Sequence, residues 1–321
     1  MKILIMGAGA VGAYFGSILS REKKSVTLVA RGKNYESMVS NGLKIESVVA
    51  GNFVTTPRVI QSSTQIDEEY DLILFSVKGY DSEEAIEFIK SAVGNNTVIV
   101  TLQNGVSSRK RLVDCFGDEQ VLQGVTYIDS TMVSPGVISQ SGGVCNILFG
   151  EDNGQITERV KEIKEALTVS SGMDVQIPEN INVSLWEKMA VVCTLAGMSC
   201  LTREEFVEVF NNSTTLNMAK KLIEEVIAVG KGSGIPLKNN VFDKTIGYLA
   251  ERNGQFVASM YVDLKNGRPI ELYDLNGGVA SIGQRVGVPT PINDFIHDTL
   301  AIYFKRSLAA VSYTHLRAHE T

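Results

Sequence analysis

The 321-residue sequence predicts an α/β domain with a parallel sheet, followed by an all-helical domain. In the first half, short runs rich in Ile, Val and Leu alternate with amphipathic stretches; the runs cover residues 2–6, 25–30, 71–77 and 97–102. Such runs are typical of strands that are buried on both faces of a parallel sheet. After about residue 180, strand signals nearly vanish and apolar residues recur at helical spacing. The length is also about right for two domains.

Each element of the first domain follows from this alternation. Helices are expected over residues 11–20 and 82–92, between the strands. From residue 121 to residue 149 the chain is rich in Ser, Thr and Gly with alternating apolar residues, which predicts antiparallel strands added to the sheet edge. A helix over 158–167 and a strand over 174–177 complete a domain that spans residues 1–180.

The second domain, residues 181–306, is predicted to be helical and to serve for substrate binding and dimerisation, although the sequence does not determine the oligomeric state. Its expected helices cover residues 184–198, 202–210, 216–231, 239–250, 270–286 and 291–305. The stretch from residue 311 shows neither helical nor strand periodicity. We therefore expect residues 307–321 to be a non-native tail, outside the fold.

Composition and charge exclude several classes of partner. A net charge of −6 and a pI near 5.3 argue against nucleic-acid binding. The first 19 residues carry a single charge, at Lys2, and resemble a signal peptide or a membrane span. Three glycines and the charged stretch 21–24 indicate instead a strand, a turn and a buried helix, so we expect a soluble, cytoplasmic protein without a membrane partner.

The cysteines do not form a metal motif. Their spacing lacks the Cys-x-x-Cys or Cys/His pattern of a zinc site; they are Cys115, Cys145, Cys193 and Cys200. Free thiols in a reducing compartment explain them, and no metal is expected.

The glycine pattern Gly7-x-Gly9-x-x-Gly12 follows the first predicted strand and opens the first predicted helix. In this context the first glycine makes the turn, the second admits a pyrophosphate, and the third lets helix and strand pack closely. The N–H groups at the helix start, including those of Ala10 and Val11, would face the phosphate. The pattern predicts a Rossmann-type dinucleotide-binding domain.

The end of the second strand favours NADP(H) over NAD(H). An NAD-preferring site places an acid there to accept hydrogen bonds from the ribose 2′-OH, but this chain has Arg31, which can pair with a 2′-phosphate. Lys33 either assists or is simply solvated. Lys78 closes the third strand at the carboxyl end of the sheet, where ligands bind; an ordinary surface lysine is the alternative.

Carbonyl reduction with NADPH also requires a proton donor. His297, in the last predicted helix, fits a helix-end or packing role better than catalysis. Lys188 lies in the first helix after the domain boundary, with Val192 and Ala196 on the same face. Partial desolvation there would lower its pKa and favour proton donation; a lysine that snorkels at a helix edge is the alternative.

The chain resembles the ketopantoate reductase (2-dehydropantoate 2-reductase) family over roughly residues 1–305. The residues that carry the resemblance are Gly7-x-Gly9-x-x-Gly12, Arg31, Ser76-Val77-Lys78, Leu102-Gln103-Asn104-Gly105, Trp186-x-Lys188, Ser259-Met260, Asp263, Gly267-Arg268 and Glu271. The resemblance implies a Rossmann domain followed by a helical domain, and NADPH-dependent reduction of 2-dehydropantoate to pantoate in pantothenate biosynthesis.

The resemblance also implies residue roles. Lys188 would be the general acid, and Glu271 would hydrogen-bond the substrate hydroxyl and help to place the lysine. Asn104 would bridge cofactor and substrate, and Ser259 would bind the substrate carboxylate. Arg31 and Lys78 would hold the phosphate side of NADP(H). From the sequence alone, Glu271 is an ordinary acid in a first helical turn after Pro269.

The sequence departs from the family at the substrate. Better-known members carry asparagines one and two turns after the helix lysine, where this chain has Val192 and Ala196. An unpaired substrate group would cost roughly 1–3 kcal/mol of recognition. The alternatives are therefore a reductase of another branched 2-oxo acid and a non-catalytic NADP(H)-binding sensor. A β-hydroxyacid dehydrogenase fits less well, because those enzymes usually place an Asn where Val192 stands.

Overall fold

The computed structural model describes residues 1–251 and 257–318, the last eight of these by their backbone alone. The chain forms two compact units. Unit 1 contains residues 1–104 and 108–181, and unit 2 contains residues 105–107 and those from 182 onward.

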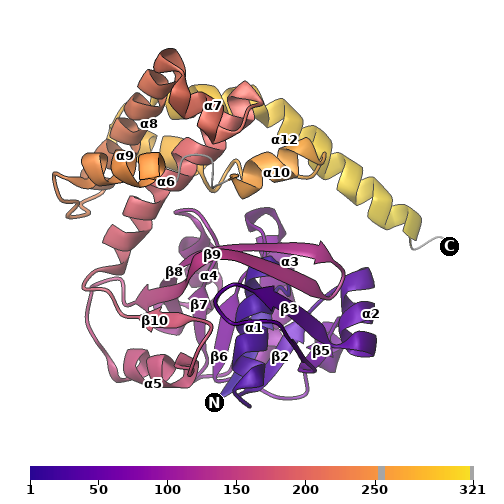
Figure 1. The fold of residues 1–321 in the computed structure, drawn as a ribbon. Helices are drawn as coiled ribbons and strands as arrows, with labels where there is room; N and C mark the ends of the chain where they lie inside the picture. Colours follow the sequence, from indigo (N-terminus) through magenta and orange to yellow (C-terminus); the bar gives the residue numbers. More distant parts are fainter. Residues whose placement is uncertain (252–256, 319–321) are drawn as a thin grey trace. The chain divides into compact units, whose positions relative to one another are not determined.

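Unit 1 is built on a ten-stranded mixed sheet with the order β4-β3-β9-β8-β7-β6-β1-β2-β5, in which β10 also pairs with β9 (Figure 1). The strands are β1 (Lys2–Met6), β2 (Ser25–Val29), β3 (Leu43–Ser47), β4 (Phe53–Thr55), β5 (Arg58–Ile60), β6 (Leu72–Phe75), β7 (Val98–Thr101), β8 (Val121–Ser134), β9 (Val137–Gly150) and β10 (Asp174–Gln176). The run from β5 through β8 is parallel, and β8 and β9 form an antiparallel hairpin. The α/β class and the appended antiparallel strands are thus confirmed.

The parallel strands are apolar throughout because both of their faces are covered. Ile3 and Ile5 of β1 belong to one buried cluster, and Leu4 and Met6 belong to another on the opposite face. Helix α1 (Ala10–Arg21) and α5 (Glu158–Leu167) supply side chains to the first cluster. Side chains of α3 (Ser82–Ile89) and α4 (Ser108–Phe116) join the second.

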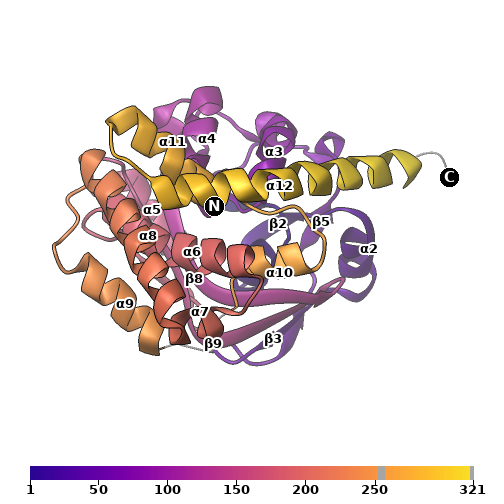
Figure 2. The same cartoon turned by 90° about the horizontal axis from the view of Figure 1, so that it is seen from above.

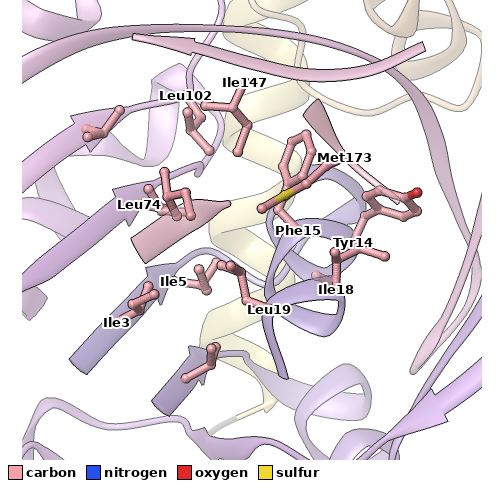
Figure 3. Close-up of a cluster of buried hydrophobic side chains, with 14 of the residues drawn as sticks. Ile3, Ile5, Tyr14, Phe15, Ile18, Leu19, Leu74, Leu102, Ile147 and Met173 are labelled. Carbon is pink, nitrogen blue, oxygen red and sulfur yellow. The ribbon is translucent and has the colours of Figure 1, made fainter. Parts of the chain in front are cut away.

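Helix α1 is buried on all sides. Every residue from Gly12 to Leu19 is buried, and the helix contacts β1 and β2 as well as β3, β8 and β9. In Figure 3, Leu19 points toward Ile5 of β1, and Phe15 lies beside Met173. A helix that is apolar all round is a core helix, which explains the low charge of the first 19 residues. The strand, turn and buried helix predicted there are confirmed.

Several elements of unit 1 were not predicted. They are α2 (Gly32–Asn41), α4, the strands β3, β4 and β5, and short 3-10 turns at Ser63–Gln65, Gly79–Asp81 and Asp118–Gln120; the helix predicted over 82–92 forms as α3 and a 3-10 turn at Lys90–Ala92. Strands β4 and β5 have only three residues each, too few to show a period. The polar face of α2 leaves Met38 as its one buried side chain, so its apolar pattern is weak.

Unit 2 is helical in its described part (Figure 2). Its helices are α6 (Ile181–Thr202), α7 (Phe206–Asn211), α8 (Ser213–Gly232), α9 (Val241–Glu251), α10 (Ser259–Lys265), α11 (Asn276–Val286) and α12 (Pro291–Ala318). Helix α8 contacts α7, α9, α11 and α12. Gly230 of α8 leaves space for Trp186 of α6, since a Cβ there would lie 3.0 Å from the indole ring.

Two expectations for unit 2 were wrong. The helix predicted over 270–286 begins only at Asn276. Glu271 lies before it, in an irregular segment. A hydrogen bond from the Gly277 N–H to the Leu272 carbonyl (2.9 Å) closes the turn at the end of this segment. The stretch from residue 311 is not irregular, because α12 continues through Ala318. Adding a residue to an existing helix requires no new nucleus, so weak periodicity does not end a helix.

Helix α6 is, among the described residues, the one helix that is long and apolar enough to cross a membrane. Of its most apolar window, 61% is buried inside the protein. That degree of burial is typical of a core helix, and α6 is accounted for by its packing in unit 2.

We expect Ile18→Ala to lower the free energy of unfolding of unit 1 by about 2–5 kcal/mol, because the Ile18 side chain in α1 is fully buried and its removal leaves a cavity. The matched control is Ile156→Ala, whose side chain is 60% exposed in the same unit and whose loss should change stability by less than about 0.5 kcal/mol. Urea denaturation followed by circular dichroism measures both. Equal destabilisation by the two variants would contradict the central packing of α1.

Candidate active site

The glycine turn between β1 and α1 is shaped by close contacts within unit 1. Gly7 has φ of +102°, and a Cβ there would lie 2.8 Å from Val77 Cγ1. At Gly12, a Cβ would lie 2.2 Å from the Gly7 carbonyl oxygen and 2.3 Å from Ser76 Oγ. Gly7 therefore requires a backbone conformation that favours glycine, and Gly12 requires the absence of a side chain.

Gly9 differs from its two neighbours because open space surrounds it. A Cβ built at Gly9 meets no atom within 4 Å, and its φ of −74° is ordinary. Gly9 precedes the first turn of α1 and provides no side-chain cap. The first N–H groups of a helix lack partners within the helix, so those of Ala10 and Val11 can bind an anion here. These residues fit the pyrophosphate of a dinucleotide, which is the group that the fingerprint predicts.

Three predicted polar residues follow neighbouring strands of the same sheet. Arg31 comes after β2, Lys78 after β6 and Asn104 after β7, and these strands are parallel. Their carboxyl ends therefore meet at the edge of the sheet that also carries the glycine turn. In open α/β sheets ligands bind at this edge. The structure thus brings the predicted nucleotide residues to one edge of unit 1.

Arg31 is held by two carboxylates that were not predicted. One guanidinium nitrogen donates to both carboxylate oxygens of Glu84, each at 2.9 Å, and the other nitrogen lies 3.5 Å from an Asp81 oxygen. Asp81 and Glu84 belong to the segment after β6, at the start of α3. The sequence does show these acids shortly after a predicted parallel strand. It cannot show that they pair with Arg31, because the pairing depends on the order of the strands in the sheet.

Two further residues donate hydrogen bonds to the backbone of the glycine turn. The Ser76 hydroxyl donates to the Gly7 carbonyl at 2.9 Å. The Asn34 side-chain amide donates to the Ala8 carbonyl at 2.9 Å, and its oxygen accepts from the Gly136 N–H at 2.9 Å. Asn34 therefore links the turn to the β8–β9 hairpin. Ser76 belongs to one of the motifs that carry the family resemblance, but no sequence pattern indicated that Asn34 contacts the turn.

In unit 2, the structure brings Lys188 and Glu271 together. The Lys188 side chain is half-buried, and burial lowers its pKa from 10.5 to about 8. The Glu271 carboxylate, 4% exposed, opposes the effect and raises the same pKa. A buried lysine beside a carboxylate keeps its proton near neutral pH but releases it more readily than a solvated lysine. The pair can therefore serve as a proton donor and its positioning partner.

Ser259, the third predicted residue of unit 2, is the first residue of α10 and is exposed. Asp263 lies one turn later and is largely buried, with its carboxylate accepting from Arg268 Nε at 2.8 Å. This ion pair connects α10 to the start of the segment that carries Glu271. His297 was not expected to be the catalytic acid. Its ring packs edge-to-face against the ring of Tyr273, with 4.9 Å between the ring centroids.

We expect Gly9→Ala to weaken NADPH binding at least about tenfold, because the added methyl group occupies the space through which a pyrophosphate approaches the helix. Folding should be nearly unaffected, since the methyl group meets no protein atom. The matched control is Gly143→Ala in β9, which is equally open and should bind NADPH as the wild type does. Isothermal titration calorimetry and thermal unfolding measure the two effects. Wild-type affinity in Gly9→Ala would show that no phosphate approaches here.

Known proteins resemble this chain over both of its units. The model of the family "Ketopantoate reductase PanE/ApbA" matches residues 3–154, and the model of its C-terminal domain matches residues 180–303. Among relatives, an uncharacterised oxidoreductase, YkpB, of Bacillus subtilis is 27% identical over 94% of this chain and 99% of its own length. A 2-dehydropantoate 2-reductase of Aquifex aeolicus is 27% identical over 92% of this chain and 94% of its own.

Solved structures share the fold over nearly the whole chain. A 2-dehydropantoate 2-reductase from Geobacter metallireducens superimposes with a TM-score of 0.87 at 25% identity and covers 95% of this chain and 99% of its own. A D-mandelate dehydrogenase, solved with NADH and anilino(oxo)acetate, has a TM-score of 0.84 at 23% identity over 95% of this chain and 99% of its own. The latter likeness concerns the fold alone.

The family matches cover both units, and they confirm the resemblance in the sequence and the Rossmann-type unit followed by helices. The chain belongs to the ketopantoate reductase family of NADP-dependent oxidoreductases acting on CH–OH groups, and it binds NAD(P)H.

Proposed function

We propose that this enzyme uses NADPH to reduce a small 2-oxo acid, and that 2-dehydropantoate, reduced to pantoate for pantothenate biosynthesis, is its first candidate substrate. The observation that carries the proposal is the lowered pKa of Lys188 beside the buried Glu271. A general acid works best when its pKa lies near the working pH. The nucleotide edge of unit 1 and the family match support the same reaction.

We assign the residues of unit 1 to cofactor binding. Gly7, Gly9 and Gly12, with the N–H groups of Ala10 and Val11, take the pyrophosphate. Arg31 and Lys78 hold the phosphate side of NADP(H), and Asn104 bridges cofactor and substrate. Support comes from the position of all these residues at the carboxyl ends of β1, β2, β6 and β7.

We assign the residues of unit 2 to proton transfer and substrate binding. NADPH, when bound, supplies the hydride that adds to the carbonyl carbon. Lys188 gives its Nζ proton to the carbonyl oxygen, which becomes the hydroxyl of the product. Glu271 hydrogen-bonds the substrate hydroxyl and helps to place the lysine and keep it charged, and Ser259 binds the substrate carboxylate. The electrostatic coupling of Lys188 to Glu271 and the exposed hydroxyl of Ser259 support these roles.

A second candidate substrate is a more apolar branched 2-oxo acid. Val192 and Ala196 lie one and two turns after Lys188 in α6, and neither side chain can hydrogen-bond a substrate hydroxyl. A site lined by such residues does not reject an apolar analogue, because no buried polar group is left unpaired. This observation favours a substrate without the hydroxyl of 2-dehydropantoate.

We also propose a cytoplasmic homodimer. All four cysteines are free thiols, three of them buried, as expected in a reducing compartment. On α12, Phe295 is 56% and Ile302 is 62% exposed, and their seven-residue spacing puts them on one face. Exposed apolar side chains grouped on a helix suit an interface, and analytical ultracentrifugation tests it.

The substrate is tested by following NADPH absorbance with 2-dehydropantoate and a panel of branched 2-oxo acids, each repeated with NADH. We expect turnover with at least one acid, and Lys188→Ala should reduce it by a factor of about 10² or more with NADPH binding unchanged. The matched control is Lys244→Ala, an exposed lysine of α9 whose loss should leave turnover unchanged.

The outcomes separate the candidates. Preference for 2-dehydropantoate identifies a ketopantoate reductase, and turnover of the apolar acids alone identifies the second substrate class. Tight NADPH binding without any turnover would replace both by an NADP(H)-binding sensor.

The pH dependence follows from Lys188. The acid must carry its proton, so kcat/KM for reduction should fall as the pH rises through about 8, the pKa of this lysine. Glu271→Gln removes the charge that raises this pKa, and the falling limb should therefore move to lower pH. Stopped-flow rates between pH 6 and pH 10, with those limits chosen to lie roughly two units on either side of the pKa, measure the shift. An unmoved limb in Glu271→Gln would rule out Lys188 as the titrating acid.

A further inference from the structure

The carboxylate of Glu84 forms a close, two-point contact with Arg31. Both of its oxygens accept from the same guanidinium nitrogen at 2.9 Å, and Asp81 adds a second carboxylate at 3.5 Å. Two carboxylates thus face one guanidinium. The side chains are well solvated, with 52% of Arg31 and 70% of Glu84 exposed. The contact is therefore weak enough to be exchanged for another anion.

The position of the contact relates it to the cofactor. Arg31 follows β2, whereas Asp81 and Glu84 follow β6, and β1 lies between these strands in the sheet. The ion pair thus spans the carboxyl end of β1, where the glycine turn begins. In a dinucleotide-binding sheet, this edge receives the ribose next to the adenine, whose 2′ substituent distinguishes NADP(H) from NAD(H).

We propose that Glu84, assisted by Asp81, determines how strongly this enzyme discriminates between NADPH and NADH. A 2′-phosphate must take the guanidinium from Glu84 and then lies near two carboxylates, which repel it. A 2′-hydroxyl meets no such opposition, because it can donate a hydrogen bond to a carboxylate. Glu84 therefore lowers the preference for NADPH that Arg31 alone would confer.

Because of two neighbouring lysines, we expect Glu84 to affect the choice between NADPH and NADH rather than dinucleotide binding as such. Lys33 lies two residues after Arg31, and Lys78 follows β6 directly. Their positive charges favour binding of either anionic dinucleotide, so we expect Glu84 to change the ratio of the two affinities rather than the ability to bind. The inference rests on the proposed role of Arg31 as the ligand of the 2′-phosphate.

The test measures dissociation constants of NADPH and NADH for the full chain by isothermal titration calorimetry, without substrate. Glu84→Gln keeps the shape of the side chain and removes its charge. We expect it to raise the preference for NADPH over NADH by roughly threefold to tenfold, mainly through tighter NADPH binding. Asp81→Asn should shift the ratio in the same direction by a smaller factor, because its contact with Arg31 is longer.

Glu83→Gln is the matched control. Glu83 precedes Glu84 in the first turn of α3, is exposed, and makes no ion pair with Arg31 in the described part of the chain. Its loss removes the same charge from the same turn, so a general effect of net charge would appear in both variants. We expect an unchanged ratio in Glu83→Gln.

A double-mutant cycle separates an action through Arg31 from simple repulsion. In an Arg31→Ala background, Glu84→Gln should change the ratio by a smaller factor than in the wild type. An unchanged ratio in Glu84→Gln, an equal shift in Glu83→Gln, or an undiminished effect without Arg31 would each overturn the proposal. None of these results depends on turnover, so a failure of the proposed 2-oxo acid reduction is recognised separately.

Discussion

The contact of Gly12 with the Gly7 carbonyl and the Ser76 hydroxyl determines how unit 1 is arranged. No side chain fits there, since a Cβ would lie 2.2 Å from one oxygen and 2.3 Å from the other. Because the start of α1 can press against the ends of β1 and β6, the helix lies deep between the parallel strands and the strands β3 and β9. The same turn leaves open space around the position of a Cβ at Gly9, directly before the first N–H groups of α1. Close packing on one side of the turn thus accompanies open space on the other, where we propose that the pyrophosphate binds.

In unit 2, the proposed proton transfer depends on a balance between burial and charge at Lys188. Burial alone favours the neutral amine, and a nearby carboxylate favours the ammonium. Burial is the larger effect, so the pKa falls well below 10.5 but stays close to 8. Glu271 lies in an irregular segment rather than in a helix. Its position is therefore set by the packing of the segment between α10 and α11, including the Asp263–Arg268 ion pair.

The nucleotide edge shows how one arginine can be adjusted by its neighbours. The proposed attraction of the Arg31 guanidinium for a 2′-phosphate depends on the groups that surround it. In this chain the α3 segment places two carboxylates within its reach. Selectivity is then a difference between two affinities, and repulsive neighbours contribute to it as much as the attractive ligand does.

The sequence by itself determined the fold class and those elements that are encoded in local periodicity or in adjacent residues. These elements are the parallel strands β1, β2, β6 and β7, the β8–β9 hairpin, most helices of unit 2 and the glycine turn. It did not reveal α2 or the short strands β3, β4 and β5, whose patterns are brief or mostly polar, and it placed Glu271 in a helix.

Only the tertiary structure decided which distant side chains meet. Arg31 and Glu84 are 53 residues apart, and they pair because β6 and β2 flank β1 in the sheet. Lys188 and Glu271 come from separate segments of unit 2, and their coupling depends on how those segments pack. Local sequence encodes whether a residue is buried within its own helix or strand, whereas the partners of its charged groups depend on the order and packing of the elements, which no single segment specifies.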